Sequence, residues 1–163
     1  MRILGIDPGI NLMGFGIIDK TTDLKVVDYG VINTPKTDSL PLRLTTIFDG
    51  VKELIETYNP DAIAIEELFY FKNQKTIIPV AEARGVIVTA GYKFCGSLYE
   101  YTPLQIKQAL TGNGRAEKKQ IQEMVKLILG LNSIPKPDDA ADALAVAICH
   151  SQTNNFIVDN SMC

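Results

Sequence analysis

Residues 3–19 read ILGIDPGINLMGFGIID and place one acidic residue at the end of an apolar run. The run from Ile3 to Ile6 has no polar side chain, a pattern typical of a central strand that is buried on both faces. Asp7 then ends it, although burying an ionised carboxylate is costly. The turn residues that follow predict a hairpin into a second strand. The stretch therefore predicts the start of a sheet with a carboxylate at one edge.

The remaining sequence alternates strand and helix patterns. Short turns between the first three strands predict an antiparallel meander, and a strand–helix–strand order predicts that the fourth strand runs parallel to a neighbour. We therefore predict an α/β fold, a five-stranded mixed sheet whose first three strands are antiparallel, with helices on both faces. The expected strands are 2–7, 13–19, 24–32, 61–67 and 97–102, and the expected helices are 39–59, 74–94, 103–110, 117–129 and 138–151.

The length and composition are those of an ordinary globular domain. The chain has 163 residues, of which 46% are hydrophobic and 21% charged. We expect a single domain over residues 1–152 and a loosely ordered tail over 153–163. No apolar run reaches the roughly 18 residues that span a bilayer, so we expect a cytoplasmic protein. The 3 cysteines are widely spaced, which argues against a disulfide framework or a zinc site.

Charge is distributed unevenly along the chain. Residues 1–71 carry 6 basic and 11 acidic side chains, whereas residues 72–126 carry 9 basic and 4 acidic ones. A basic middle segment beside acidic segments fits a protein that binds phosphates in one place and cations in another. An ordinary solvated surface would explain the same block equally well.

Several carboxylates end or begin buried patterns. Asp7 ends the first strand and Glu66 the fourth, while Asp139 and Asp142 are three residues apart and share one face of the last helix. Asp138 could share that face equally well. Taken singly, each has an ordinary explanation: a turn at Asp7, a lysine partner for Glu66, a helix cap at Asp138 or Asp139.

Together these carboxylates indicate a metal site. Acidic groups brought close to one another do not all stay ionised without a compensating charge. Oxygen ligands without histidine or cysteine favour magnesium or manganese. A pair of such cations is the usual apparatus for cleaving phosphodiester bonds.

Four segments of the chain resemble those of RuvC-type Holliday junction resolvases, the crossover junction endodeoxyribonucleases. They are ILGIDPGINLMGFGIID, AIAIEELF, GNGRAEKKQIQ and PDDAADALAVAICH, and the likeness runs from residue 2 to about 152. The resemblance implies an RNase H-like fold and a homodimer that cuts four-way DNA junctions by paired symmetric nicks, in recombination and repair. It also implies two Mg2+ per active site, with Mn2+ as a substitute, and leaves branch-migration helicase proteins open as partners.

Position by position, the resemblance assigns the acidic residues. It places Glu67 outside the metal site and leaves Asp138 as a helix cap. The position of Asp139 carries histidine in some members of the family, so this ligand is the least constrained. Lys118 matches a lysine near the scissile phosphate. The catalytic and metal-binding acids implied are Asp7, Glu66, Asp139 and Asp142, with Lys118 as a further catalytic residue.

The resemblance also implies a DNA-contacting surface. Phe69 matches an aromatic residue that presses on bases at the junction centre, and Tyr70 beside it would assist by stacking. Packing in the core or in a dimer interface is the alternative for both, and a solvated charge is the alternative for each basic residue. The candidate phosphate contacts are Lys72, Lys75, Arg84, Lys107, Arg115 and Lys119.

Two further expectations concern the oligomeric state and the other protein classes that the motifs would fit. The helix over 74–94 is apolar along much of its length, and a C2 dimer would match the two equivalent strands of a junction. An actin-like kinase shares the DxG turn but needs a second domain. YqgF-type nucleases lack the DAADALA ending, and a catalytically silent junction-binding protein would have lost an acidic residue.

Overall fold

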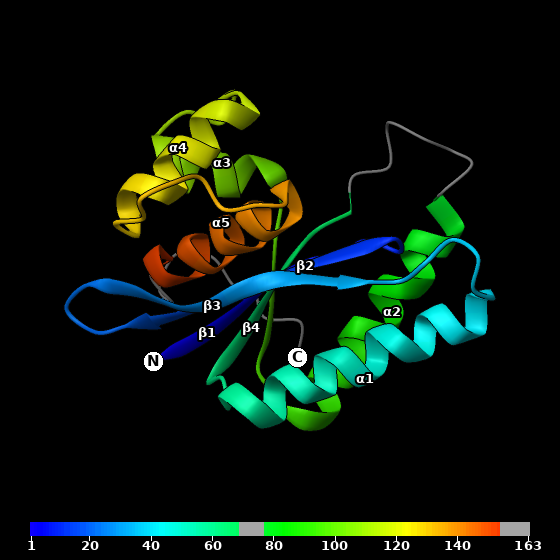
Figure 1. Cartoon of the computed structure of the whole chain (residues 1–163). Helices are drawn as coiled ribbons and strands as arrows, with labels where there is room; N and C mark the ends of the chain where they lie inside the picture. The colour runs from blue at the N-terminus through cyan, green and yellow to red at the C-terminus, as the bar shows by residue number, and fades with distance from the viewer. Residues whose placement is uncertain (69–76, 154–163) are drawn as a thin grey trace.

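The computed structural model describes residues 1–68 and 77–153, which contain one five-stranded sheet and helices on both of its faces (Figure 1). The strand order is β3-β2-β1-β4-β5. The strands are β1 (Arg2–Asp7), β2 (Leu12–Lys20), β3 (Leu24–Asn33), β4 (Ala62–Glu66) and β5 (Leu98–Tyr101).

The pairing of the strands confirms the predicted topology. Strands β1, β2 and β3 pair antiparallel, and β4 lies parallel to both β1 and β5. Two consecutive apolar residues of β1 face opposite cores, since Ile3 packs in one hydrophobic cluster and Leu4 in the other. The first strand is therefore central and buried on both faces, as its apolar run indicates.

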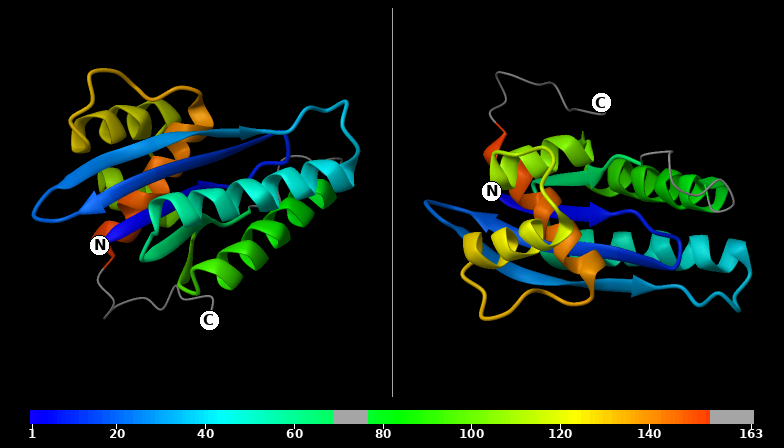
Figure 2. Two further views of the ribbon diagram at one scale, coloured as in Figure 1. Left: turned by 60° about the horizontal axis from the view of Figure 1, so that its bottom comes forward. Right: turned by 90° about the horizontal axis from the view of Figure 1, so that it is seen from above.

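The helices form one layer on each side of the sheet, as the two views in Figure 2 show. Helices α1 and α2 pack against each other on one face, and α3, α4 and α5 cover the other. The helix bounds are α1 (Leu40–Tyr58), α2 (Ile77–Phe94), α3 (Pro103–Thr111), α4 (Lys118–Ile128) and α5 (Asp138–Gln152).

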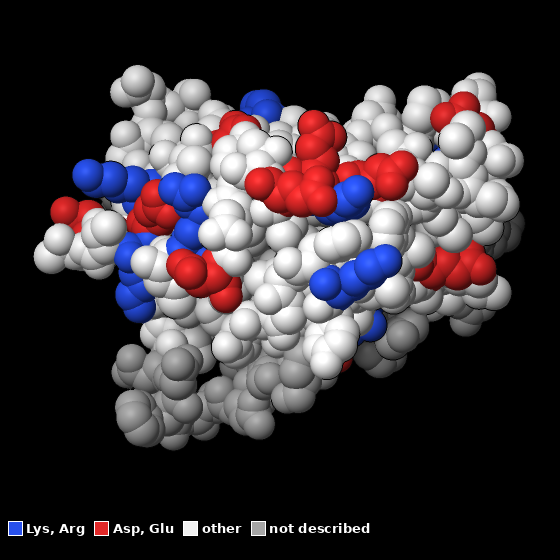
Figure 3. Space-filling view, turned by 90° about the horizontal axis from the view of Figure 1, so that it is seen from below, with Lys and Arg blue, Asp and Glu red and all other residues white. Residues whose placement is uncertain are grey.

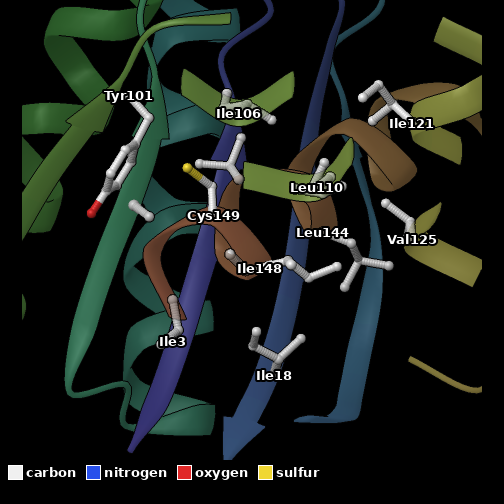
Figure 4. Close-up of a cluster of buried hydrophobic side chains, with 14 of the residues drawn as sticks. Ile3, Ile18, Tyr101, Ile106, Leu110, Ile121, Val125, Leu144, Ile148 and Cys149 are labelled. Carbon is white, nitrogen blue, oxygen red and sulfur yellow. The ribbon is translucent and has the colours of Figure 1, made fainter. Parts of the chain in front are cut away.

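The core on the α3–α5 face is built around α5, whose residues from Ala143 to Ser151 are all buried (Figure 4). His150 belongs to this core, because its Nδ1 lies 2.7 Å from the buried Tyr101 hydroxyl. Burial lowers the pKa of His150 to about 4, so the ring is neutral near pH 7. The only histidine of the sequence is thus a packed residue near a helix end, as expected.

The local signals of the sequence place the helix ends well. Thr102 and Gln105 form a reciprocal capping box at the start of α3, with Pro103 in its first turn. Gly130 has a φ of 62° just after α4, the left-handed conformation that ends helices. Residues 74–76 of the predicted second helix, and the tail from 154 onward, lie outside the described residues. None of the described helices is both long and apolar enough to cross a membrane.

Candidate active site

Asp7 and Glu66 end two adjacent parallel strands. Ile6 of β1 is level with Ile65 of β4, so the next residue of each strand, Asp7 or Glu66, emerges at the same edge of the sheet. The residues before them are fully buried, which fixes both backbones at this edge. The sheet therefore holds the two carboxylates side by side, because the parallel neighbour that the strand–helix–strand order predicts for the fourth strand is β1.

Helix α5 brings the other acidic residues to this edge because it lies almost directly on the strand backbones. A Cβ atom added at Gly5 would be 2.1 Å from the Ala143 carbonyl oxygen, and one at Gly14 would be 2.0 Å from the Asp139 carbonyl oxygen. Asp7 pairs with Gly14 in the sheet, so it lies next to the first turn of α5. Glycine is required at Gly5 and Gly14 because of this close approach.

Asp138 does not cap α5, and the prediction that it does is wrong. Pro137 occupies the N-cap position, and Asp138 is the first helical residue. Its two carboxylate oxygens face lysines instead: Oδ1 accepts a hydrogen bond from Lys136 Nζ at 2.8 Å, and Oδ2 lies 3.6 Å from Lys118 Nζ. Pro137 cannot supply a capping side chain, so α5 starts without a side-chain cap. The carboxylate of its first residue is paired with lysines instead.

Lys118, the first residue of α4, joins the acidic residues. Its Nζ donates a hydrogen bond to Asp142 Oδ2 at 2.9 Å. The two side chains line a cleft of about 230 Å³ between α3, α4, α5 and the end of β4. Glu66 and Lys107 line the same cleft, so carboxylates and lysines share one concave site. Its other lining residues are Pro103, Ile106, Ile121 and Ala145.

Asp7, Glu66 and Asp142 hold their protons more tightly than ordinary carboxyl groups. Burial, followed by the repulsion of Glu66, raises the pKa of Asp7 well above its usual value. Burial and the charge of Asp142 raise the pKa of Glu66 to about 7. The pKa of Asp142 is also raised by burial, although its hydrogen bond from Lys118 opposes the shift. Acidic groups with raised pKa values at one edge are the electrostatic signature of a functional site.

The donor set fits a hard divalent cation. As the side chains stand in residues 1–68 and 77–153, they form no group of three or more acidic, histidine or cysteine side chains close enough to share one metal ion. Lys118 instead supplies the positive charge beside Asp142. The repulsion between Asp7, Glu66 and Asp142 is nevertheless what a cation would relieve, and all three offer oxygen ligands.

The predicted DNA-contact residues are divided between three settings. Lys107 lies in the cleft, whereas Arg115 and Lys119 line a larger hollow of about 830 Å³ beside the α3–α4 loop. Arg84 pairs with Glu100, with 2.9 Å between Nε and Oε1, which ties α2 to β5 and favours a structural role. The remaining candidates, Phe69, Tyr70, Lys72 and Lys75, lie outside the described residues.

Two contributors to the site were missed by reasoning from the sequence. Gly5 lies inside the apolar run and permits the approach of α5, but a single glycine in a strand gives no hint of what packs on it. Lys136 stands two residues before Asp138 in the loop IPKPDD, and it turns back onto that carboxylate. The available signal was a basic residue two positions before an acidic one in the segment KPDD.

A mixed α/β sheet with carboxylates and lysines in one cleft fits the class of phosphodiester-cleaving nucleases. Comparison with known proteins gives the family. Residues 3–150 match the family described as "Crossover junction endodeoxyribonuclease RuvC". The chain therefore belongs to the RuvC family of crossover junction endodeoxyribonucleases.

Individual relatives agree with this assignment. The chain is 54% identical over 157 residues to the crossover junction endodeoxyribonuclease RuvC of Alkaliphilus oremlandii, and 51% identical over 158 residues to that of Caldanaerobacter subterraneus; each match covers 96% of both chains. Thermus thermophilus RuvC in complex with Holliday junction substrate superposes with a TM-score of 0.87 and 34% identity, covering 93% of each chain. These matches confirm the fold that the resemblance implied.

Proposed function

We propose that this protein resolves four-way DNA junctions by cutting two strands at symmetric positions, as part of DNA recombination and repair. The observation that carries the proposal is the convergence of carboxylates from β1, β4 and α5 beside Lys118, in a member of the RuvC family. The solved complex of the Thermus thermophilus relative with a Holliday junction supports the choice of substrate. The match over residues 3–150 supports a single nuclease domain over residues 1–152.

The metal site that we propose holds two Mg2+ ions, for which Mn2+ can substitute. Its ligands are Asp7, Glu66, Asp139 and Asp142. These residues would hold the cations, which would supply the positive charge needed to activate a water molecule and to stabilise the leaving oxygen. The raised pKa values of Asp7, Glu66 and Asp142 support this set, because a divalent cation favours their ionised forms. The backbone contact between Gly14 and Asp139 supports the inclusion of that residue.

The lysines of the cleft would bind the phosphate through their positive charges. Lys118 and Lys107 approach the acidic residues from α4 and α3, so a phosphate bound between them would meet both positive charges. Arg115 and Lys119 continue the positive charge beyond the cleft, along the hollow next to the α3–α4 loop. Such contacts position the DNA backbone without reading its sequence.

We further propose that the protein acts as a homodimer in the cytoplasm, with branch-migration helicase proteins as candidate partners. Helix α2 presents two large apolar side chains to solvent, Ile78 at 67% and Tyr92 at 62% exposure. In Figure 3, the face seen from below carries charged side chains of both signs in small groups, with uncharged areas between them. A second copy that covers α2 would bury these side chains and place two sites on one junction.

A cutting assay tests the proposal. A mobile four-way junction labelled on each strand is incubated with the full chain and Mg2+, with a linear duplex of the same sequence as the control. We expect paired nicks at symmetric positions in the junction, and an intact duplex. Binding of the junction without any nick would contradict the proposed activity and identify a junction-binding protein instead.

The dimer is tested separately by analytical ultracentrifugation at micromolar concentration. We expect a species of twice the chain mass, and a shift to the single chain mass for Tyr92→Asp. A monomer for the unchanged protein would contradict the homodimer while leaving the nuclease proposal to the cutting assay.

A further inference from the structure

Asp138 makes contacts that its place in the helix does not require. A carboxylate in the first turn of a helix is stabilised by the helix dipole alone, and needs no lysine partner. Asp138 nevertheless binds Lys136 through one oxygen and approaches Lys118 with the other. Lys136 comes from the loop before α5 and Lys118 from the start of α4, so the carboxylate links two separate segments. It lies between Lys136 and Lys118, and Lys118 lines the cleft.

Lys118 is shared between two acidic residues of different kinds. Its Nζ lies 2.9 Å from Asp142, a proposed metal ligand, and 3.6 Å from Asp138, which stands outside the proposed ligand set. The lysine side chain is 55% exposed, so its long stem has room to move. Both acceptors are therefore within its reach from one backbone position.

The contacts of Lys118 with Asp142 and with Asp138 respond differently to a cation at the site. A cation bound by Asp142 repels the Lys118 ammonium group, so the ion pair between Lys118 and Asp142 is lost. Asp138 keeps its negative charge, because it does not share the cation. The hydrogen bond from Lys136 fixes the other oxygen of Asp138 and so limits how that carboxylate turns. Lys118 retains a partner at the rim of the cleft rather than swinging into solvent.

We propose that Asp138 is a positioning residue, which holds Lys118 at the edge of the cleft once Asp142 is engaged by a cation. In the cation-free protein Lys118 neutralises Asp142. During cutting it shifts to Asp138, next to the phosphate. The inference deepens the proposed function and rests on it. It also gives the first acidic residue of the DD pair a role distinct from that of the second.

The test is a double-mutant cycle on the full chain with Asp138→Asn, Lys118→Ala and the two combined. One readout is single-turnover nicking of a four-way junction at saturating Mg2+. The other needs neither DNA nor catalysis: calorimetric titration of Ca2+ into the protein alone. Asp23→Asn, an exposed aspartate in the β2–β3 turn, serves as the control for loss of one negative charge.

We expect Asp138→Asn to slow nicking about fivefold, equivalent to roughly 1 kcal/mol, and to weaken Ca2+ binding about threefold, since Lys118 then stays on Asp142. Neither effect should appear when Lys118 is already alanine. Asp138→Glu should restore most of both, because the longer carboxylate still reaches the ammonium group. Asp23→Asn should change neither, and Asp138→Asn should lower the midpoint of thermal unfolding only slightly, because the ion pairs of Asp138 are partly exposed.

Equal effects of Asp138→Asn with and without Lys118 would overturn the inference, since they would assign Asp138 a direct electrostatic role or a purely structural one. This failure is distinguishable from failure of the proposed function. If the unchanged protein cuts junctions and the cycle shows no coupling, only the positioning role is wrong. If the Ca2+ titrations show coupling but no junction is cut, Asp138 does compete with Asp142 for Lys118, and the proposed activity is wrong.

Discussion

The two faces of the sheet are packed in different ways. On one face α5 lies at backbone distance from β1 and β2, because Gly5 of β1 faces the backbone of Ala143 and Gly14 of β2 faces that of Asp139. On the other face α1 and α2 are separated from the sheet by branched side chains such as Ile47, Val51 and Ile87. The proposed metal ligands lie where this close-packed face meets the ends of β1 and β4.

The difference explains how the site is kept in shape. Long aliphatic side chains adjust when a neighbour changes size, whereas a backbone in van der Waals contact with another has no side chain that could give way. Asp139 and Asp142 are therefore fixed relative to Asp7 by main-chain contact. The α1–α2 face supplies hydrophobic stabilisation without setting the geometry of the site.

The largest effect is expected from breaking the close contact. In Gly5→Ala the new methyl group would meet the Ala143 carbonyl oxygen at 2.1 Å, so α5 must move away from β1. We expect a loss of about 3 kcal/mol of unfolding free energy, measured by urea denaturation, together with loss of junction cutting.

The matched substitution on the other face is Gly50→Ala in α1. There the nearest atom is the end of the Ile32 side chain, at 2.3 Å, which can rotate away. Alanine also favours the helix by about 1 kcal/mol, so the net change should stay within about 1 kcal/mol of zero. Equal destabilisation by Gly5→Ala and Gly50→Ala would contradict the contrast between the two faces.

A smaller effect on stability, with a large effect on rate, is expected for Lys118→Ala. Its ion pairs are partly exposed and stabilise the fold by about 1 kcal/mol or less. Loss of a positive charge beside the reacting phosphate should slow nicking by about a hundredfold. Single-turnover kinetics and urea denaturation on the same preparations separate the two. Parallel losses of rate and stability would make Lys118 a structural residue.

The sequence predicts much of this arrangement and misses some of it. The strand–helix–strand order predicts that β4 runs parallel to a neighbour, and in the structure β1 is such a neighbour, which brings Asp7 and Glu66 together. The spacing of Asp139 and Asp142 gives their shared helix face. The partner of Arg84 was not predictable, because Glu100 is distant in sequence and meets it only through packing of α2 on β5. The contacts of Asp138 with Lys118 and Lys136 were not predicted, because capping and the helix dipole already explain an acidic residue at a helix start.

The smallest effect is a dependence of stability on pH. The pKa of Glu66 is about 7 in the folded protein against an ordinary value of 4.5, so its protonated form is favoured by folding. That contribution is complete below the unfolded pKa and is lost as the pH rises through 7. Without divalent cations, we expect the unfolding free energy to fall by about 1 kcal/mol between about pH 5 and 8.

Two variants show whether this pH dependence belongs to the site. Glu66→Gln should make the profile less steep, although burial also raises the pKa values of Asp7 and Asp142. Glu53 is an exposed residue of α1, and Glu53→Gln should leave the profile as it is. Saturating Mg2+ should flatten it as well, by favouring the ionised carboxylates. If Glu66→Gln left the dependence of stability on pH unchanged, the pKa of this carboxyl group would not be raised by the site.

The central claim is that carboxylates of β1, β4 and α5 hold divalent cations at a site that cuts four-way junctions. Asp7→Asn tests this claim most directly. Cutting and binding of one labelled junction are measured for the unchanged protein and the variant, in Mg2+ and in Ca2+. We expect the variant to bind the junction within about threefold of the unchanged protein and to nick it at least about a thousandfold more slowly. Nicking by Asp7→Asn at the rate of the unchanged protein would contradict the account.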